Sequence, residues 1–203
     1  MPEYHEVTKP KQLLVEGKDA LNLFTAMLKN LEIPSIQVQD FGGINELNPF
    51  LQAFSKSSGF KKNVTSVGII RDAETDFSAA FQSVCSALDN SNLPIPQNPI
   101  ERTATQPQIS IFILPDNKSA GMLETVCLNS VINDPAMICV DDYFTCIKQK
   151  LGYAPNKIEK ARLQTFLASR EEPQKYLGIA CFKNVWPWDS EPFDNIKRFL
   201  SDL

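Results

Sequence analysis

Histidine is almost absent from this chain of 203 residues: His5 is the only one. Catalytic Ser-His-Asp and Cys-His arrangements need at least one histidine, and most zinc sites need several. These classes of site are therefore excluded unless His5, near the start of the chain, supplies the base. Metal-dependent phosphoryl chemistry is not excluded, because carboxylates, Mg²⁺ and a lysine suffice for it.

Paired cysteines and long apolar runs are also missing. None of the five cysteines forms a Cys-x-x-Cys motif, so we expect reduced thiols in the core rather than disulfides or a metal site. No apolar run approaches the roughly 20 residues that cross a bilayer, and residues 1–6 lack the basic and apolar regions of a secretory signal. We therefore expect a cytoplasmic protein with no membrane partner.

The chain also lacks an excess of positive charge, since its formal net charge is -4. No overall field draws the chain to nucleic acid, and a polyanion would need a local basic patch. Gly17-Lys18-Asp19 is not a Walker A loop, because the spaced glycine and the following Ser or Thr are missing. The candidate patches, for which solvated surface is the simpler interpretation, are Lys56, Lys61 and Lys62, and Lys148, Lys150, Lys157, Lys160 and Arg162.

Strand and helix patterns alternate over the first part of the chain. Apolar runs predict strands at 12–16, 36–39, 64–71 and 109–114, and helical spacing predicts helices at 18–31 and 75–90. A further helix is expected with Asn48 as its cap and Pro49 as its first residue, and 55–63 is expected to be a loop. Because βα units use right-handed crossovers, this part should form a mostly parallel sheet between two helical layers.

Helix patterns dominate after residue 116. They cover 122–131, 134–150 and 156–169, and a last helix is expected from about Pro192, whereas 176–188 is ambiguous. The Trp186-Pro187-Trp188 sequence is interpreted as a packed aromatic anchor, with a base-stacking platform as the alternative. We therefore predict an α/β domain at 10–116 and a mainly helical C-terminal extension at 117–203 that packs on it.

Acidic residues follow two of the predicted strands. Glu16 comes directly after the first, and Asp72 and Glu74 come at the end of the third. In an open parallel sheet, ligands bind outside the carboxyl ends of the strands, so these side chains should converge. Oxygen ligands of this kind suit Mg²⁺, which takes one or two carboxylates together with water and substrate phosphates. The alternative is that each acid only stabilises the start of the helix after it.

Four segments resemble a known family. They are Leu14-Val15-Glu16-Gly17-Lys18-Asp19, Ile69-Ile70-Arg71-Asp72-Ala73-Glu74, Leu114-Pro115-Asp116 with Gly121-Met122-Leu123-Glu124, and 156–162. The first part of the chain resembles Toprim, the catalytic domain of topoisomerases, primases and OLD-type nucleases. The whole chain resembles a bacterial family of uncharacterised Toprim-related proteins. The resemblance implies a Toprim-like three-layer α/β/α fold with a C-terminal helical part.

The resemblance also implies roles for particular residues. Glu16 would act as general acid/base or metal ligand, and Asp72 and Glu74 would hold Mg²⁺ or Mn²⁺ where Toprim proteins have an Asp-x-Asp pair. The second member is a glutamate here and the glycine that often follows is missing, so Asp76 is a substitute ligand. Lys18 would face phosphate. Asp116 and Glu124 could join the acids, although helix-start acids are the simpler account.

Two functions stay open from the sequence. One is a Mg-dependent nuclease or phosphodiester-transfer activity on DNA or RNA. The other is a non-catalytic module that keeps the Toprim fold and binds nucleic acid, a nucleotide or a protein partner.

Overall fold

A parallel sheet of four strands forms the centre of the protein in the computed structural model, which describes residues 6–183 and 185–203. Its strands are β1 (Lys11–Val15), β2 (Ile36–Asp40), β3 (Ser66–Asp72) and β4 (Gln108–Leu114), in the order β2-β1-β3-β4. Val15 pairs with Asp40 on one side and with Ile70 on the other. The carboxyl ends of β1 and β3 therefore lie side by side at the middle of the sheet.

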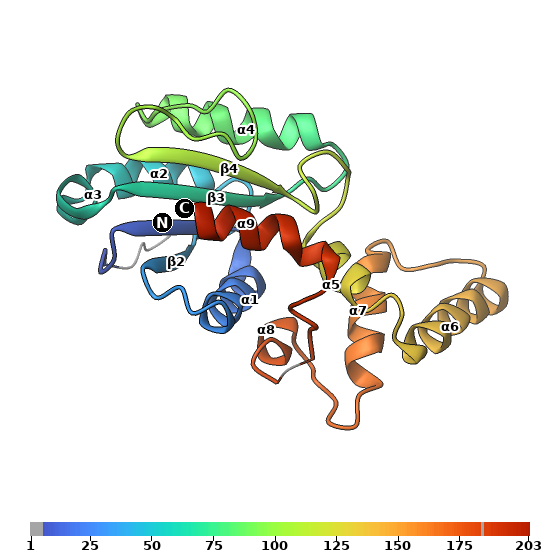
Figure 1. Ribbon diagram of the computed structural model, residues 1–203. Coiled ribbons are helices and arrows are strands. Elements are labelled where there is room, and N and C mark those ends of the chain that lie inside the picture. Colours follow the sequence, from blue (N-terminus) through green and yellow to red (C-terminus); the bar gives the residue numbers. More distant parts are fainter. Residues whose placement is uncertain (1–5, 184) are drawn as a thin grey trace.

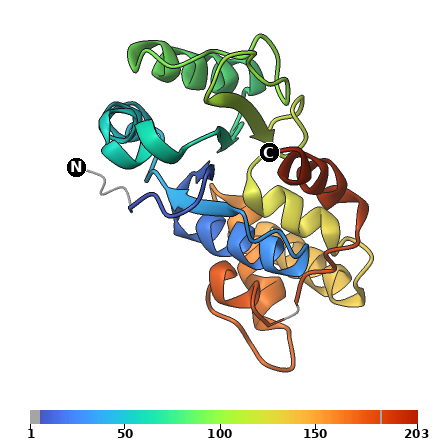
Figure 2. The same ribbon diagram turned by 60° about the vertical axis from the view of Figure 1, so that its left-hand side comes forward.

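Helices cover both faces of the sheet (Figures 1 and 2). On one face lie α2 (Leu47–Lys56), α3 (Ser58–Asn63) and α4 (Phe77–Asn90). On the other lie α1 (Gly17–Asn30), α5 (Leu123–Ser130) and α9 (Asp194–Asp202), with η1 (Glu191–Phe193) leading into α9. Alternate strand residues serve the two cores: Leu13 and Val15 belong to the core under α1, and Leu14 to the core under α2 and α4. The predicted three-layer α/β/α fold with a parallel sheet is confirmed.

The C-terminal part is helical, as predicted. It adds α6 (Pro135–Leu151), α7 (Ile158–Ala168) and α8 (Leu177–Ala180) beyond α5. The chain then returns to the sheet, where Ser66 Oγ donates a hydrogen bond to the carbonyl oxygen of Leu203 (2.9 Å). Trp186 is buried and stacks on Phe166 with a 6.2 Å centroid separation, which supports the anchor interpretation. The boundary at 116/117 stays a prediction.

Three local expectations were wrong. The expected loop at 55–63 contains α3, because Ser57 caps a helical turn by accepting a hydrogen bond from the Phe60 N–H (3.2 Å). Helix α2 begins at Leu47 rather than Pro49, which is tolerated because the first-turn N–H groups of a helix need no intrahelical partner. All five cysteines are free thiols, but Cys139 and Cys146 are exposed on α6 and not in the core.

No helix within the described ranges is both long and apolar enough to cross a membrane.

Candidate functional site at the carboxyl ends of β1 and β3

The chain reverses its direction of travel across the sheet at β1. From β1 it crosses to β2 through α1 on one face, and from β2 it passes to β3, on the other side of β1, through α2 and α3 on the opposite face. Such a reversal leaves a crevice at the carboxyl ends of the two central strands, where α/β proteins bind ligands. Glu16 follows β1 and Asp72 ends β3, so both predicted acids lie at this point.

Glu16 faces a buried arginine across the two strand ends. Arg71, the residue before Asp72, is 5% exposed, and its Nε lies 3.8 Å from Glu16 Oε2. Its Nη1 donates a hydrogen bond to the carbonyl oxygen of Ala80 (3.2 Å), whereas Nε is buried without a hydrogen-bond partner. Burial raises the pKa of Glu16 and lowers that of Arg71, and the attraction between the two charges partly opposes both shifts.

Asp72 is held by the start of α5. Its Oδ1 accepts a hydrogen bond from the Leu123 N–H (2.9 Å), which leaves Oδ2 as the free oxygen. Burial, followed by repulsion from Glu16 and Glu124, raises the pKa of Asp72 to about 7. The positive end of α5 and the Leu123 bond therefore do not offset the surrounding negative charge. The site therefore keeps an excess of negative charge that another cation would neutralise.

Glu74 occupies an unusual backbone position. Its φ of 54° lies in the left-handed region, which few non-glycine residues adopt. Two backbone hydrogen bonds hold it there: the Glu74 N–H donates to the carbonyl oxygen of Gly121 (2.8 Å), and the Gly121 N–H donates to the carbonyl oxygen of Glu74 (2.9 Å). Glycine is favoured at position 121, because its φ of 143° is rare for other residues and a Cβ there would lie only 3.0 Å from Thr125 Oγ1 and 3.1 Å from Pro115 Cδ. Strained backbone held by its surroundings is common at functional sites.

Glu124 and Lys160 complete the group. Glu124, in the first turn of α5, is 7% exposed and pairs with Lys160 Nζ of α7 at 3.4 Å. Burial disfavours the ammonium charge, but Glu124, Asp72 and Glu74 together outweigh it and raise the pKa of Lys160. We call Glu16, Asp72, Glu74 and Glu124, with the cations Arg71 and Lys160, the strand-end cluster. Its acids outnumber its cations by two.

The other predicted residues lie outside this cluster. Asp76 is exposed and caps α4 by accepting a hydrogen bond from the Ala79 N–H (3.0 Å). Lys18 is exposed in the first turn of α1. Asp116 accepts bonds from Ser119 and Lys118 within its own turn. The ligand role of Asp76 and the phosphate role of Lys18 stay predictions, and His5 lies outside the described residues.

Two contributors were not assigned to the site from the sequence. Arg71 lies in a buried strand, and the pattern of apolar residues in such a strand does not indicate that a carboxylate will lie next to it. Asp40, at the end of β2, accepts hydrogen bonds on Oδ1 from the Gly17 N–H (2.8 Å) and the Gly42 N–H (2.7 Å). It thereby fixes the turn that carries Glu16. The sequence signal that could have identified Asp40 is its position at the end of a predicted strand, shortly before Gly42-Gly43.

Within the described part of the chain, no group of three or more His, Cys, Asp or Glu side chains is arranged to hold a metal ion. Glu16 is instead turned towards Arg71. The carboxylate oxygens still match the preference of Mg²⁺, which needs only one or two protein carboxylates. The buried Arg71 Nε that lacks a hydrogen bond marks a site balanced by charge rather than by complete hydrogen bonding.

Fold and site together define a three-layer α/β/α protein with an acidic cluster at the switch point of its sheet. The chain belongs to the family described as Protein of unknown function (DUF3226), whose model matches residues 10–203. No curated protein sequence matches it.

Solved structures similar to the chain include the C-terminal region of the OLD protein of Xanthomonas campestris pv. campestris. One such structure is 16% identical and has a TM-score of 0.40, over 87% of this chain and 79% of that one. A second is 15% identical with a TM-score of 0.40, over 95% and 82%. At these identities and scores, no residue role transfers to this chain.

Proposed function

We propose that this protein is a Toprim-related, divalent-metal-dependent phosphodiesterase acting on nucleic acid at the strand-end cluster. The observation that supports this most directly is the excess of carboxylates over cations where β1 and β3 end, at the switch point of the sheet. Mg²⁺ or Mn²⁺ would bring the missing positive charge. The resemblance of the Glu16 and Asp72 segments to Toprim motifs gives the reaction class.

Asp72 would hold the metal, and Glu16 would either bind it as well or move the proton. Asp72 offers Oδ2, because its Oδ1 is already fixed by Leu123. Glu16 would turn from Arg71 towards the ion, and Glu74 lies close enough for its charge to act on both acids. The metal would neutralise phosphate charge and lower the pKa of a bound water.

The residues of the chain would carry the remaining steps. Glu16, a partly buried carboxyl group with a raised pKa, is suited to take a proton from the attacking water or return one to the leaving oxygen. Lys160 carries an ammonium group that is half exposed beside Glu124 and can contact a phosphate oxygen. Arg71, once released by Glu16, would balance the remaining acids.

A second candidate is a binding module without turnover. One observation favours it: Arg71 already acts as counter-ion to Glu16, the residue that catalysis would use. In that case nucleic acid or a nucleotide would bind without cleavage.

Turnover separates the two candidates. Purified protein with Mn²⁺ or Mg²⁺ should nick supercoiled DNA or degrade single-stranded DNA or RNA, and EDTA should stop it. Glu16→Gln should lower the rate by at least about 100-fold, as expected for the loss of a general acid–base group. Glu172→Gln, at an exposed acid between α7 and α8, is the matched control and should cleave at the wild-type rate. Equal cleavage by folded Glu16→Gln protein would refute the catalytic assignment.

Metal binding is tested apart from turnover. Mg²⁺ at about 100 times its Kd should stabilise the wild-type protein by about 2.7 kcal/mol, seen as a rise in Tm. Asp72→Asn keeps the acceptor for Leu123 but loses the charge, so its rise should be smaller. Asp89→Asn, which changes an exposed acid near the C-terminal end of α4, is the control. A Tm rise in wild type without cleavage would select the second candidate, and equal rises in all three proteins would place the metal elsewhere.

A further inference from the structure

The end of α6 and the loop after it carry an unusual charge for this protein. Residues 143–157, which we call the tip segment, contain Lys148, Lys150 and Lys157 and no aspartate or glutamate, although the whole chain has a net charge of -4. Within the described residues, none of these three lysines forms an ion pair. The nearest acids in sequence lie just outside the segment, at Asp142 and Glu159.

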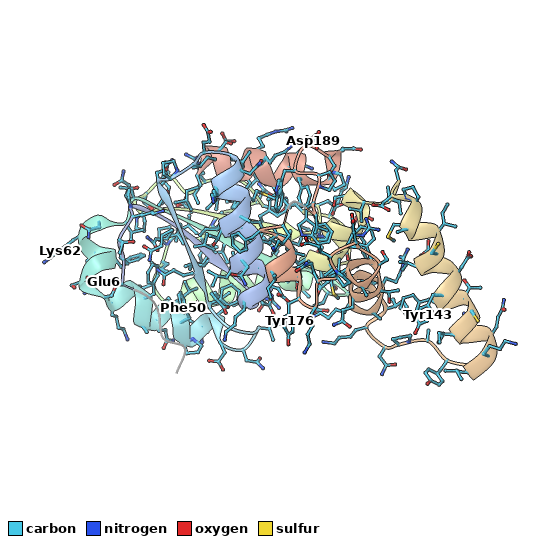
Figure 3. All side chains as sticks on the ribbon, turned by 90° about the horizontal axis from the view of Figure 1, so that it is seen from below. Glu6, Phe50, Lys62, Tyr143, Tyr176 and Asp189 are labelled. Carbon is cyan, nitrogen blue, oxygen red and sulfur yellow. The ribbon has the colours of Figure 1, made fainter. Side chains whose placement is uncertain are left out.

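The tip segment is also exposed and aromatic. Of the residues of α6, only Met137 and Val140 are buried, both near its start. Tyr143 is 51% and Tyr153 62% exposed, and the Tyr143 ring also meets the Phe144 ring edge to face, with centroids 5.0 Å apart. Figure 3 shows Tyr143 on α6 at one end of the molecule, with Lys62 at the opposite end.

The chain leads from this segment directly to the strand-end cluster. After the α6 cap at Gly152 it returns through Lys157, the residue before α7, and one turn later Lys160 reaches Glu124. Arg162, two residues further along α7, forms an ion pair with Asp141 of α6 and so links the two helices. In Figure 1, α7 lies between α6 and α5, and the loop after α6 leads back to the start of α7, which carries Lys160.

We propose that the tip segment binds single-stranded nucleic acid and guides it to the strand-end cluster, an inference that rests on the proposed function. The lysines complement backbone phosphates, which dominate the affinity of such contacts. The exposed tyrosines offer faces on which unpaired bases stack, and bases in a duplex do not present these faces. The partner is therefore a single strand rather than a duplex.

Binding without turnover is the direct test. Fluorescence anisotropy of a labelled single-stranded DNA of about 20 nucleotides, longer than the roughly 4–16 that one binding fold covers, is measured in EDTA so that no cleavage occurs. Wild type should bind the single strand more tightly than the matching duplex. The double change Tyr143→Ala with Tyr153→Ala should weaken binding by about tenfold or more, as lost base stacking predicts.

The lysines have their own readout. Lys148→Ala with Lys150→Ala should reduce the slope of log Kd against log salt by about 1.4, at about 0.7 for each single-strand phosphate contact. The controls remove the same groups elsewhere: Lys61→Ala with Lys62→Ala on α3, and Tyr176→Ala, whose ring is 53% exposed beside α8. Both controls should bind like wild type.

Unchanged affinity and salt slope in the tip variants, with binding by wild type, would overturn the inference and leave the proposed function standing. Equal losses in the controls would also overturn it, because the contact would then be diffuse. Failure of wild type to bind any single strand would refute the tip as a binding surface, and cleavage of other substrates would still decide the proposed function. Light scattering that shows dissociation of an oligomer in the tyrosine variant would assign the segment to self-association instead.

Discussion

Asp72 links the charge of the strand-end cluster to the stability of the fold. Its pKa is raised to about 7 by burial and then by Glu16 and Glu124, so the folded state holds a proton that the unfolded chain releases near pH 4. Stability from this group is therefore present at low pH and is lost as the pH rises towards and through 7. Glu16, whose pKa is also raised by burial, adds to the same trend.

The expected result is a metal-free wild type that loses on the order of 2 kcal/mol of unfolding free energy through Asp72 between pH 5 and pH 7. Asp72→Asn should lose less over this range and be more stable than wild type at pH 8. Urea denaturation in EDTA at several pH values measures both. Parallel pH curves for the two proteins would mean that Asp72 ionises normally in the folded state.

Arg71 supplies positive charge that stabilises the folded state by offsetting the negative charge of Glu16. Replacing this buried guanidinium group by an apolar side chain, in Arg71→Met, leaves Glu16 without its paired cation and should cost on the order of 3 kcal/mol in EDTA. The double change with Glu16→Gln should recover part of that loss, because the pair is removed together. Mg²⁺ should stabilise Arg71→Met more than wild type. Additive costs in the double variant, measured by urea denaturation, would show that the two side chains do not interact.

At the scale of elements, the turn between β1 and α1 is positioned from a neighbouring strand. Asp40→Ala removes the acceptor of the Gly17 and Gly42 N–H groups and should cost about 1–3 kcal/mol, the usual effect of unsatisfied donors. Asp40→Asn keeps Oδ1 and should cost less. Because the same turn carries Glu16, the alanine variant should also lower any metal-dependent cleavage, whereas equal activity in both variants would confine Asp40 to a structural role.

Sequence patterns located most elements because each has a strong local signal. The run at 109–114 is apolar apart from Ser110, and β4 spans Gln108–Leu114. Asp134 before Pro135 predicts the start of α6, where the structure has it. Helix α3 has no comparable signal, since its six residues include Gly59 and two lysines and bury only Phe60. In the ambiguous segment 176–188, the described residues form the short α8 and otherwise turns and irregular backbone.

The candidate site was predictable to the extent that it depends on strand ends. Glu16, Asp72 and Glu74 follow from the rule that parallel strands present their carboxyl ends at one edge. Lys160 was not predicted to join the site, because its contact with Glu124 depends on how α7 packs on α5. Arg71 is similar: its charge faces Glu16, just after the neighbouring strand β1, and its Nη1 donates to Ala80 on α4, and only the folded register brings these groups together.

For the whole molecule, the question is whether residues 10–116 and 117–203 unfold separately. One core cluster joins strand residues such as Phe112 to Phe199 of α9, whose ring centroids lie 5.4 Å apart, while a second core on the other face of the sheet contains Phe54. Both tryptophans, Trp186 and Trp188, lie in the C-terminal part. Their fluorescence reports on that part, and far-UV circular dichroism reports on all the helices and strands.

Phe199→Ala and Phe54→Ala each empty a fully or almost fully buried site, and each should cost about 3–5 kcal/mol. Since α9 packs directly on the sheet, we expect a single transition in which fluorescence and circular dichroism coincide in wild type and in both variants. Phe54→Ala gives the more stringent test, because Phe54 lies on the opposite face of the sheet from both tryptophans. The substitution should still shift the fluorescence transition as far as it shifts the circular dichroism transition. A tryptophan transition that stays at its wild-type urea concentration in Phe54→Ala, while the dichroism splits into two steps, would show that 10–116 and 117–203 are separate cooperative units.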